Sequence, residues 1–377
     1  MAINEQEIQN IVRSVLKGMA VETPAAKAPV SGLKGIFKTP DEAIAAAKAA
    51  QKEIQPMPLE FREKIISNIR KKTLENAKML SELAVEETGM GNVGHKIIKH
   101  QLVAEKTPGT EDLSTIAWSG DRGLTLTEMG PWGVIGAVCP STNPTATVIC
   151  NSIGMLAAGN AVVFMPHPSA KNCSNLAIDM VNRASIEVGG PANIVTAVED
   201  PTMEVSNYIF KHKDVDMLCA TGGPGVVTAV LSSGKRAMGA GAGNPPVLVD
   251  ETANIPKAAE DIINGCTFDN NLPCIAEKEV VAVDMIADEL IYHMEQAGCY
   301  HASPEEVQKL VDTVLEEKNG KKIISRKCVG RSAKVLLSKI GVTVGDDIRC
   351  IIFEGEKTHP LIWTELMMPI LGIVRVK

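Results

Sequence analysis

Aromatic residues are scarce in this chain of 377 residues, where Phe, Trp and Tyr together make up 3%. Ala, Val, Ile and Gly are plentiful instead, a profile that suits α/β packing better than an all-β sandwich. No apolar run reaches the length of a membrane helix, and the N-terminus lacks a charged-then-apolar secretory pattern. We therefore expect no membrane partner, and the length is enough for two or three domains.

Positive charge is not in excess either. The net charge is −7, so nucleic acid is not an expected partner. The nine cysteines form no CxxC and no pair at metal-ligand spacing, and the seven histidines form no HExxH, so no metal site is predicted. An odd, unpatterned set of cysteines fits a reducing compartment, which predicts a cytoplasmic protein.

Residues 1–19 are predicted to form a separate amphipathic helix, followed by a Pro- and Ala-containing linker over residues 20–35. Two interpretations stay open, a helix that folds back on its own domain and a docking peptide that binds a partner's groove. The acidic Glu5 and Glu7 disfavour a mitochondrial presequence. The apolar stripe consists of Ile8, Ile11, Val12, Val15, Leu16 and Met19.

Two long helices and an exposed strand are predicted next. Asp41 is the expected cap of a helix over 42–55, and residues 59–88 are amphipathic. The alternating stretch 124–129 predicts an exposed strand that is available for an interface.

From residue 133 onward, strand and helix patterns alternate, which predicts a parallel sheet with nucleotide-binding potential. A second α/β segment runs from about residue 253 to the end and includes a predicted helix over 304–318. The expected strands of the series are 133–138, 161–164, 194–197, 217–220 and 246–249; the expected helices are 147–157, 170–188, 203–211 and 225–232.

Cys274 stands out among the cysteines because it lies in a polar, turn-forming run, Asn270-Asn271-Leu272-Pro273-Cys274, just before an apolar strand. A thiol at the mouth of a strand is a nucleophile candidate, and the alternative is a packed cysteine. We interpret five others as core residues, because they lie in or beside apolar segments: Cys139, Cys150, Cys173, Cys219 and Cys266.

Two glycine-rich runs are candidate ligand sites. Thr221, Gly222 and Gly223 lie between a strand and a helix, where backbone N–H groups bind phosphate; a plain tight turn is the alternative. The run 239–246 contains Gly239 and Gly241, and glycine there lets a backbone approach a ligand closely. A flexible loop would explain this run equally well.

Taken together, these pieces resemble the aldehyde dehydrogenase superfamily, and specifically its coenzyme A-acylating branch. The resemblance covers about residues 36–377, and it implies an NAD-binding domain over 36–245 and a catalytic domain over 246–377. The matching segments, in the family's order, are Gly130–Gly136, Pro140–Pro144, Pro166–Pro168, Thr221–Gly223, Gly239–Pro246, Asn271–Cys274 and Glu365–Pro369.

The resemblance implies roles for individual residues. Cys274 matches the nucleophile that forms a thiohemiacetal and then a thioester with the aldehyde. An asparagine side chain helps the nucleophile's own N–H to bind the oxyanion; Asn143 is our choice, although gap-free matching falls on Thr142. Glu365 matches the residue that holds the nicotinamide ribose. The remaining cofactor-binding candidates are Thr142, Pro166, His167, Thr221, Gly222, Gly223, Gly239 and Gly241; for His167 a plain loop role is the alternative.

Two departures from the family pattern carry information. The glutamate that activates water in hydrolysing members falls at Gly239 or Ala240, neither of which is acidic, so transfer of the acyl group to coenzyme A is favoured over hydrolysis. The family's lysine near the adenosine ribose is replaced by Met165. Family chains also continue well past Glu365, which implies either a fragment or a shortened protein with an incomplete catalytic domain.

The leading hypothesis is an NAD-dependent, coenzyme A-acylating dehydrogenase of propionaldehyde or acetaldehyde. Its resemblance to microcompartment members implies that residues 1–19 bind shell protein and place the enzyme in the lumen of a bacterial microcompartment, as a homo-oligomer. A hydrolytic aldehyde dehydrogenase and a catalytically impaired cargo protein are the alternatives.

Overall fold

A computed structural model describes residues 32–318 and 320–377. These residues divide into two compact units, one made of residues 32–88 and 97–241 and the other of residues 89–96, 242–318 and 320–377. The predicted docking helix over 1–19, and the linker as far as residue 31, lie outside the described residues. The sequence did not predict that the short segment Gly89–Lys96 belongs to the second unit.

The first unit is built on a six-stranded sheet in the order β1-β6-β5-β4-β7-β8, in which every pair of neighbours is parallel. The first strand, β1, lies at one edge; from β4 in the interior the chain then moves through β5 to β6 beside β1, and returns to the other side of β4 with β7 and β8. The strands are β1 (Ile36–Phe37), β4 (Val134–Val138), β5 (Ala161–Met165), β6 (Val195–Val198), β7 (Met217–Thr221) and β8 (Arg236–Ala240).

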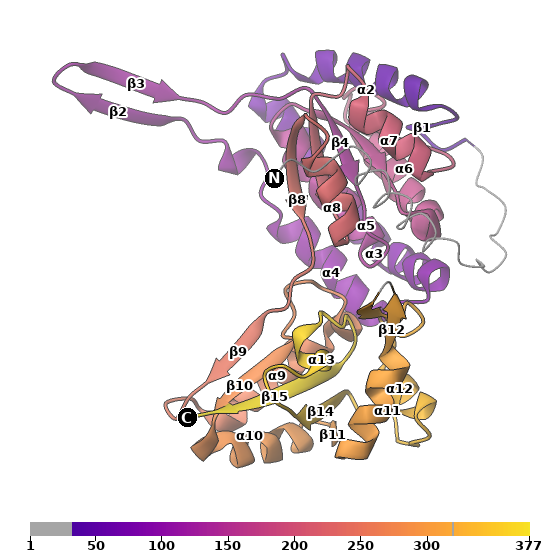
Figure 1. Cartoon of the computed structure of the whole chain (residues 1–377). Helices are drawn as coiled ribbons and strands as arrows, with labels where there is room; N and C mark the ends of the chain where they lie inside the picture. The colour runs from indigo at the N-terminus through magenta and orange to yellow at the C-terminus, as the bar shows by residue number, and fades with distance from the viewer. Residues whose placement is uncertain (1–31, 319) are drawn as a thin grey trace. The chain divides into compact units, whose positions relative to one another are not determined.

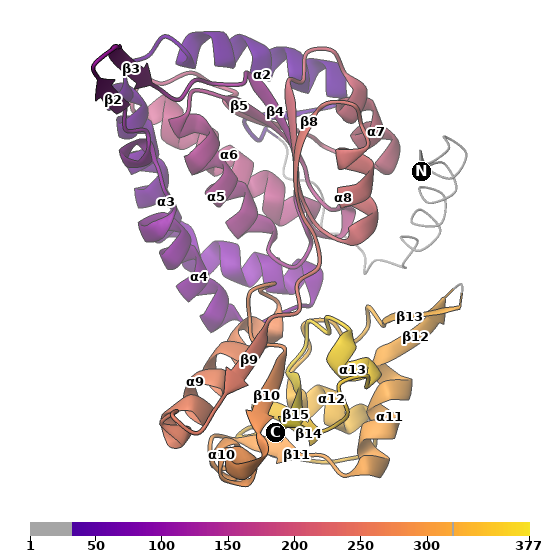
Figure 2. The ribbon, with the colours of Figure 1, turned by 60° about the vertical axis from the view of Figure 1, so that its left-hand side comes forward.

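Helices cover both faces of this sheet (Figure 2). In β5, Val162 and Phe164 point into one apolar core, while Ala161, Val163 and Met165 point into another. Burial on both faces is what a parallel sheet with crossover helices requires. The helices are α2 (Pro40–Ile54), α3 (Leu59–Thr88), α5 (Pro144–Ala157), α6 (Lys171–Glu187), α7 (Met203–Lys211) and α8 (Pro224–Leu231), with α4 (Val93–Lys106) beginning in the second unit and the short 3₁₀ turns η1 (Thr110–Asp112) and η2 (Pro168–Ala170).

An antiparallel hairpin projects from the first unit (Figure 1). Its strands, β2 (Ile116–Gly120) and β3 (Gly123–Thr127), are exposed along their whole length. The exposed strand predicted over 124–129 is therefore present, and it pairs with a strand that the sequence pattern did not indicate. Large apolar side chains on the hairpin, including those of Trp118, Leu124 and Leu126, face solvent.

The second unit contains a five-stranded parallel sheet in the order β11-β14-β15-β10-β9. In β14, Cys350 and Ile352 point into one apolar core and Ile351 and Phe353 into the other. The strands are β9 (Pro246–Val249), β10 (Glu279–Val283), β11 (Cys299–His301), β14 (Cys350–Glu354) and β15 (Ile370–Val376).

Among its described residues this unit also contains five helices, a 3₁₀ turn and a small antiparallel pair of strands. The helices are α9 (Ile255–Thr267), α10 (Asp284–Gln296), α11 (Pro304–Val314), α12 (Ala333–Lys339) and α13 (Pro360–Trp363); the turn is η3 (Phe268–Asn271), and the paired strands are β12 (Leu315–Lys318) and β13 (Lys321–Ile324). None of the helices in the described ranges is long and apolar enough to cross a membrane.

Three predicted helix boundaries were wrong by two residues or more. The helix expected over 304–318 ends at Val314, because Leu315–Lys318 pairs with β13. The helix expected from 147 begins at Pro144, whose fixed φ suits the first helical turn. The helix expected from 42 begins at Pro40, and its cap is Thr39 rather than Asp41.

The predicted core cysteines fall into two groups. Cys139, Cys173 and Cys266 are buried as expected, whereas Cys150 and Cys219 are only partly buried.

The Thr39 cap yields a stability prediction. Its Oγ accepts the N–H of Glu42 at 3.3 Å, and Glu42 Oε2 accepts the N–H of Thr39 at 3.1 Å, which forms a capping box. Thr39→Ala should lower the free energy of unfolding by about 1 kcal/mol. Chemical denaturation measures this change, with the exposed Glu53→Ala in the same helix as control, expected to stay within about 0.5 kcal/mol of the parent. An equal effect of both substitutions would contradict the capping role.

Candidate active site

Cys274 is the one exposed cysteine; the other eight, all within the described residues, are buried or partly buried. It lies in the loop that joins η3 to β10, before the N-terminal end of that strand, which pairs with β9 and β15 in the second sheet. A nucleophilic thiol has to be accessible, whereas a structural cysteine is normally buried. The placement therefore meets the first requirement of the nucleophile hypothesis.

The backbone just before Cys274 takes an uncommon course. Asp269, Asn270 and Asn271 have φ values of 51°, 54° and 63°, so three consecutive non-glycine residues are left-handed. Asp and Asn tolerate this region better than other L-residues, yet they normally visit it singly. The turn persists only where its surroundings fix it, and two sets of buried contacts do so.

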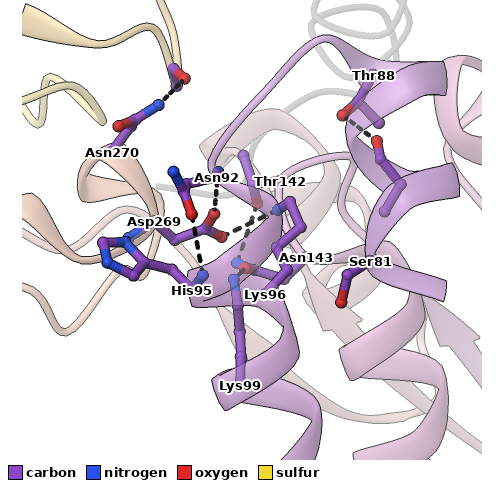
Figure 3. A network of polar contacts seen from close by, with 12 residues as sticks. Ser81, Thr88, Asn92, His95, Lys96, Lys99, Thr142, Asn143, Asp269 and Asn270 are labelled. Carbon is purple, nitrogen blue, oxygen red and sulfur yellow. Dashed lines mark hydrogen bonds and ion pairs between the residues drawn. The ribbon is translucent and has the colours of Figure 1, made fainter. Parts of the chain in front are cut away.

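The first set holds Asp269 (Figure 3). Its carboxylate accepts the N–H of Asn92 at 2.8 Å and the ammonium of Lys96 at 2.9 Å. Its own N–H donates to His95 Nδ1 at 2.9 Å, and the His95 ring stacks on Phe268 with centroids 5.0 Å apart. Lys96 and Asp269 are both buried. The segment Gly89–Lys96 thus anchors one side of the turn.

The second set holds Asn271 and involves Lys278. The Lys278 ammonium donates to Asn271 Oδ1 at 2.5 Å and to the carbonyl oxygens of Asn271 and Pro273, each at 3.2 Å. Asn271 Nδ2 in turn donates to the carbonyl oxygens of Cys266 at 2.8 Å and Glu277 at 2.9 Å. Both ends of the Asn271 side chain are therefore fixed.

Glu365 and the glycine-rich run lie close to Cys274 in the same unit. A Cβ on Gly243 would come within 2.8 Å of the Cys274 carbonyl oxygen, so only glycine fits there without a shift. The Gly243 N–H donates to the Glu365 carboxylate, which lowers the pKa of Glu365, but burial outweighs this and leaves its pKa raised. Cys274 and Glu365, predicted from distant parts of the sequence, are thus joined through Gly243.

In the first unit, the candidates gather where the strand order reverses. β4 lies between β5 and β7, and the chain leaves β4 toward β5 but later returns beside it as β7. Ligands of open parallel sheets bind at the carboxyl ends of strands at such a switch point. Thr142 and Asn143 follow β4, and Thr221–Gly223 ends β7, so both predicted groups lie at that place.

Asn143 is the N-cap residue of α5, although its side chain does not cap the helix. Its Oδ1 accepts a hydrogen bond from the Lys99 ammonium, and its Nδ2 donates to Thr142 Oγ at 3.3 Å (Figure 3). Because an ammonium only donates, it selects the amide orientation in which the NH₂ group faces away from Lys99. Lys99 therefore fixes which end of Asn143 is the donor.

Gly223 caps α8, and the Gly222 N–H donates to the Ala240 carbonyl at 3.1 Å. Gly239 is part of β8 rather than of a loop, and a Cβ there would meet Val227 of α8 at 2.7 Å. Close packing of helix on strand thus explains this glycine without a ligand. Gly241 is exposed, and a Cβ there would only reach ordinary contact with Val227.

Pro166 and His167 follow β5 at the same carboxyl edge of the sheet. Pro166 is buried, and His167 Nδ1 accepts hydrogen bonds from the Ser169 N–H at 3.2 Å and the Ser169 hydroxyl at 2.8 Å. These bonds support the plain loop role for His167, and its cofactor-binding role stays a prediction.

Fold and site together define a class: a two-unit α/β protein with an accessible cysteine on a fixed loop and a nucleotide-type switch point. The model of the aldehyde dehydrogenase family matches residues 14–377. The chain belongs to the aldehyde dehydrogenase family.

Its relatives are of the coenzyme A-acylating type. An acetaldehyde dehydrogenase (acetylating) of Bilophila wadsworthia is 45% identical, with all of this chain and 80% of that protein aligned. The structure of a propionaldehyde dehydrogenase from the fucose utilisation microcompartment of Clostridium phytofermentans is 63% identical, with a TM-score of 0.88, over 91% of this chain and 78% of that one. A Rhodopseudomonas palustris propionaldehyde dehydrogenase, 53% identical with a TM-score of 0.87 over 91% and 78% of the chains, holds coenzyme A and an acylated cysteine.

Several residues around the site were not predicted from the sequence. Lys96, Lys99 and Lys278 each bind a residue of a predicted motif, and Gly243 contacts Cys274. A lysine in the sequence carries no sign that it is buried. Of the three lysines only Lys278 is close in sequence to a predicted motif, four residues after Cys274, and its neighbours Glu277 and Glu279 give no sign of burial.

The Asp269 contacts generate a stability prediction. Lys96→Met removes the ammonium from a buried carboxylate, and such a change typically costs about 3–5 kcal/mol of unfolding free energy. The loosened turn should also expose Cys274 to a different extent, so its alkylation rate by iodoacetamide should change. Denaturant unfolding and mass spectrometry of the Cys274 peptide measure both effects.

The matched control is Lys257→Met, which breaks the exposed ion pair with Asp261 one helical turn away. Surface pairs contribute about 0–1 kcal/mol, and alkylation of Cys274 should be unchanged. If Lys96→Met were no more destabilising than Lys257→Met, the Asp269 contacts would not be what holds the turn.

Proposed function

We propose that this chain oxidises a short-chain aldehyde to its acyl-coenzyme A thioester with NAD as hydride acceptor. The observation that carries the proposal is Cys274, the one exposed thiol, on a loop fixed from two sides in a member of the aldehyde dehydrogenase family. The names of the acylating relatives, and the acylated cysteine in one of them, support the same chemistry.

The first unit fits a dinucleotide. Its parallel sheet has a switch point between β4 and β7, and the backbone of Gly222 and Gly223 leads into the N-terminus of α8. A Cβ on Gly223 would meet nothing within 4 Å, so the space beside this turn is open. Bound NAD would accept the hydride of the aldehyde. Thr221–Gly223 would lie by its pyrophosphate, and Glu365 would hold the nicotinamide ribose.

In the proposed mechanism the Cys274 thiolate attacks the aldehyde carbon, forming a C–S bond while the carbonyl π pair moves onto oxygen. The Cys274 N–H and Asn143 Nδ2 would stabilise that oxyanion, and Lys99 holds Asn143 with its NH₂ group turned away from the ammonium. Collapse of the oxyanion expels hydride and leaves a thioester on Cys274. Coenzyme A, having lost its thiol proton to solvent, would then attack the thioester carbon as a thiolate and expel Cys274 as its thiolate.

The absence of an acidic residue at the end of β8 favours transfer of the acyl group to coenzyme A rather than to water. Gly239 and Ala240, the positions of the hydrolytic base, are the last residues of the strand and are exposed. Without a general base, which typically supplies about 10²–10⁴-fold, water attack on the thioester should be slow. A thiol ionises near about pH 8–9 and needs less activation.

Location and assembly complete the proposal. The Clostridium phytofermentans relative comes from a microcompartment, and the amphipathic stretch 1–19 suits a shell-docking helix. The exposed apolar side chains of the β2–β3 hairpin suit an interface between copies of the chain.

The catalytic part of the proposal is tested with acetaldehyde and propionaldehyde, each with and without coenzyme A. NADH formation should require coenzyme A and should fall to background in Cys274→Ala, because no other thiol is exposed. Cys328→Ala, which alters a buried cysteine, is the control and should retain turnover. Free acid formed at full rate without coenzyme A would favour hydrolysis, and a folded chain without any turnover would favour the cargo alternative.

The docking part is tested by fusing residues 1–19 to a fluorescent protein in cells that form microcompartments. Punctate fluorescence is expected, and Ile11→Glu should make it diffuse by placing a charge in the apolar stripe. Gln9→Glu adds the same charge outside the stripe and should leave the puncta intact. Diffuse fluorescence of the unaltered fusion would count against docking.

A further inference from the structure

Lys278 makes an unusual set of contacts for a lysine. Its residue exposure is only 4%, and its three N–H donors meet three acceptors: Asn271 Oδ1, the Asn271 carbonyl and the Pro273 carbonyl. All three acceptors belong to the segment that leads into Cys274. All three N–H donors of the ammonium are therefore used by the loop that carries Cys274.

No carboxylate of the described residues lies within ion-pair distance of this ammonium. Burial lowers the pKa of Lys278, while the charges of Glu365, Cys266, Cys274 and Glu279 raise it, with burial the larger effect. A buried cation that is held by neutral oxygens costs free energy that an apolar side chain would not. A role in positioning the loop would account for a cation here.

The decisive contact is the one to Pro273. The Pro273 carbonyl and the Cys274 N–H are the two polar ends of one rigid, planar peptide unit. A donor bound to that oxygen fixes the direction of the N–H and polarises it, because hydrogen bonds in series strengthen one another. The Ala276 N–H donates to the same oxygen at 3.1 Å. Within the described chain, the Cys274 N–H itself donates to no protein group.

We infer that Lys278 is a positioning residue that orients and polarises the Pro273–Cys274 peptide unit, which makes the Cys274 N–H a stronger oxyanion donor. The inference rests on the proposed function, in which that N–H binds the oxygen of the aldehyde and later of the thioester. Lys278 touches neither substrate and acts only through the peptide. A stronger oxyanion donor would accelerate two steps, the attack of Cys274 on the aldehyde and the attack of coenzyme A on the thioester. Both steps place negative charge on the oxygen of the former aldehyde group.

The test replaces the ammonium by a neutral group of similar length, Lys278→Met. Complete loss of one oxyanion donor typically costs about 10²–10³-fold in kcat; here the donor stays but is weakened, so a fall of about 10- to 100-fold is expected. KM for aldehyde and coenzyme A should stay within about twofold, as for an interaction made only in the transition state. Lys278→Arg, which keeps the charge, should recover part of kcat.

A spectroscopic measurement separates positioning from a general loss of structure. Acyl-enzyme prepared from carbonyl-labelled propionyl-coenzyme A shows the thioester carbonyl in isotope-difference infrared spectra. Weaker hydrogen bonding in Lys278→Met should move this band to higher frequency. Lys257→Met, which alters an exposed lysine of α9, should leave both kcat and the band unchanged.

Unchanged kcat and an unchanged band in folded Lys278→Met would overturn the inference, as would a raised KM with unchanged kcat. If Lys278→Met does not fold, Lys278→Gln keeps an NH₂ donor group without the charge. It should show the same direction of change, and wild-type behaviour there overturns the inference equally. Activity of Cys274→Ala would instead refute the proposed function. An inactive Cys274→Ala beside a fully active Lys278→Met refutes the role of Lys278 alone.

Discussion

The candidate site depends on a left-handed turn of three residues, Asp269–Asn271, held between two buried lysines. Non-glycine residues in this conformation cost on the order of 1–3 kcal/mol each when they are strained. Lys96 binds the first side chain of the turn, and Lys278 binds the last. Neither side chain acts on a substrate. Their charges are used to keep a backbone conformation from which Cys274 emerges exposed.

Glycines make the same site possible because they have no side chain. Gly91 lies where a Cβ would overlap the Asp269 carboxylate, and Gly243 lies against the Cys274 carbonyl. The turn and the loop can therefore be enclosed by backbone rather than by side chains. In that arrangement Cys274 is exposed, together with the neighbouring Ile275. Two glycines of the run 239–246 therefore have different roles. Gly239 leaves room for helix α8, and Gly243 leaves room for Cys274.

Much of the fold was predictable because it follows from local pattern. Strands buried on both faces read as short apolar runs, and the βαβ series was placed within a few residues of its observed bounds. The errors came from tertiary effects. Residues 315–318 have a helical sequence pattern but pair with β13. Thr39 rather than Asp41 caps the first helix, because Pro40 begins it. The nucleophile position was predictable from a motif, whereas its support was not. Lys96 and Asp269 are 173 residues apart, and nothing in either neighbourhood indicates the other.

The charges around Lys278 explain why its ammonium binds carbonyl groups rather than a carboxylate. Glu365 and Glu279 are the carboxylates whose charges raise the pKa of Lys278, and burial raises the pKa of both, that of Glu279 to about 7. Near neutral pH, Glu279 therefore carries only part of a negative charge. One of its carboxylate oxygens is buried without a hydrogen-bond partner, which also favours the protonated form. A partly neutralised acid competes weakly for the ammonium. The field of the cation is then directed at the peptide groups of the loop, which is where an oxyanion donor benefits from it.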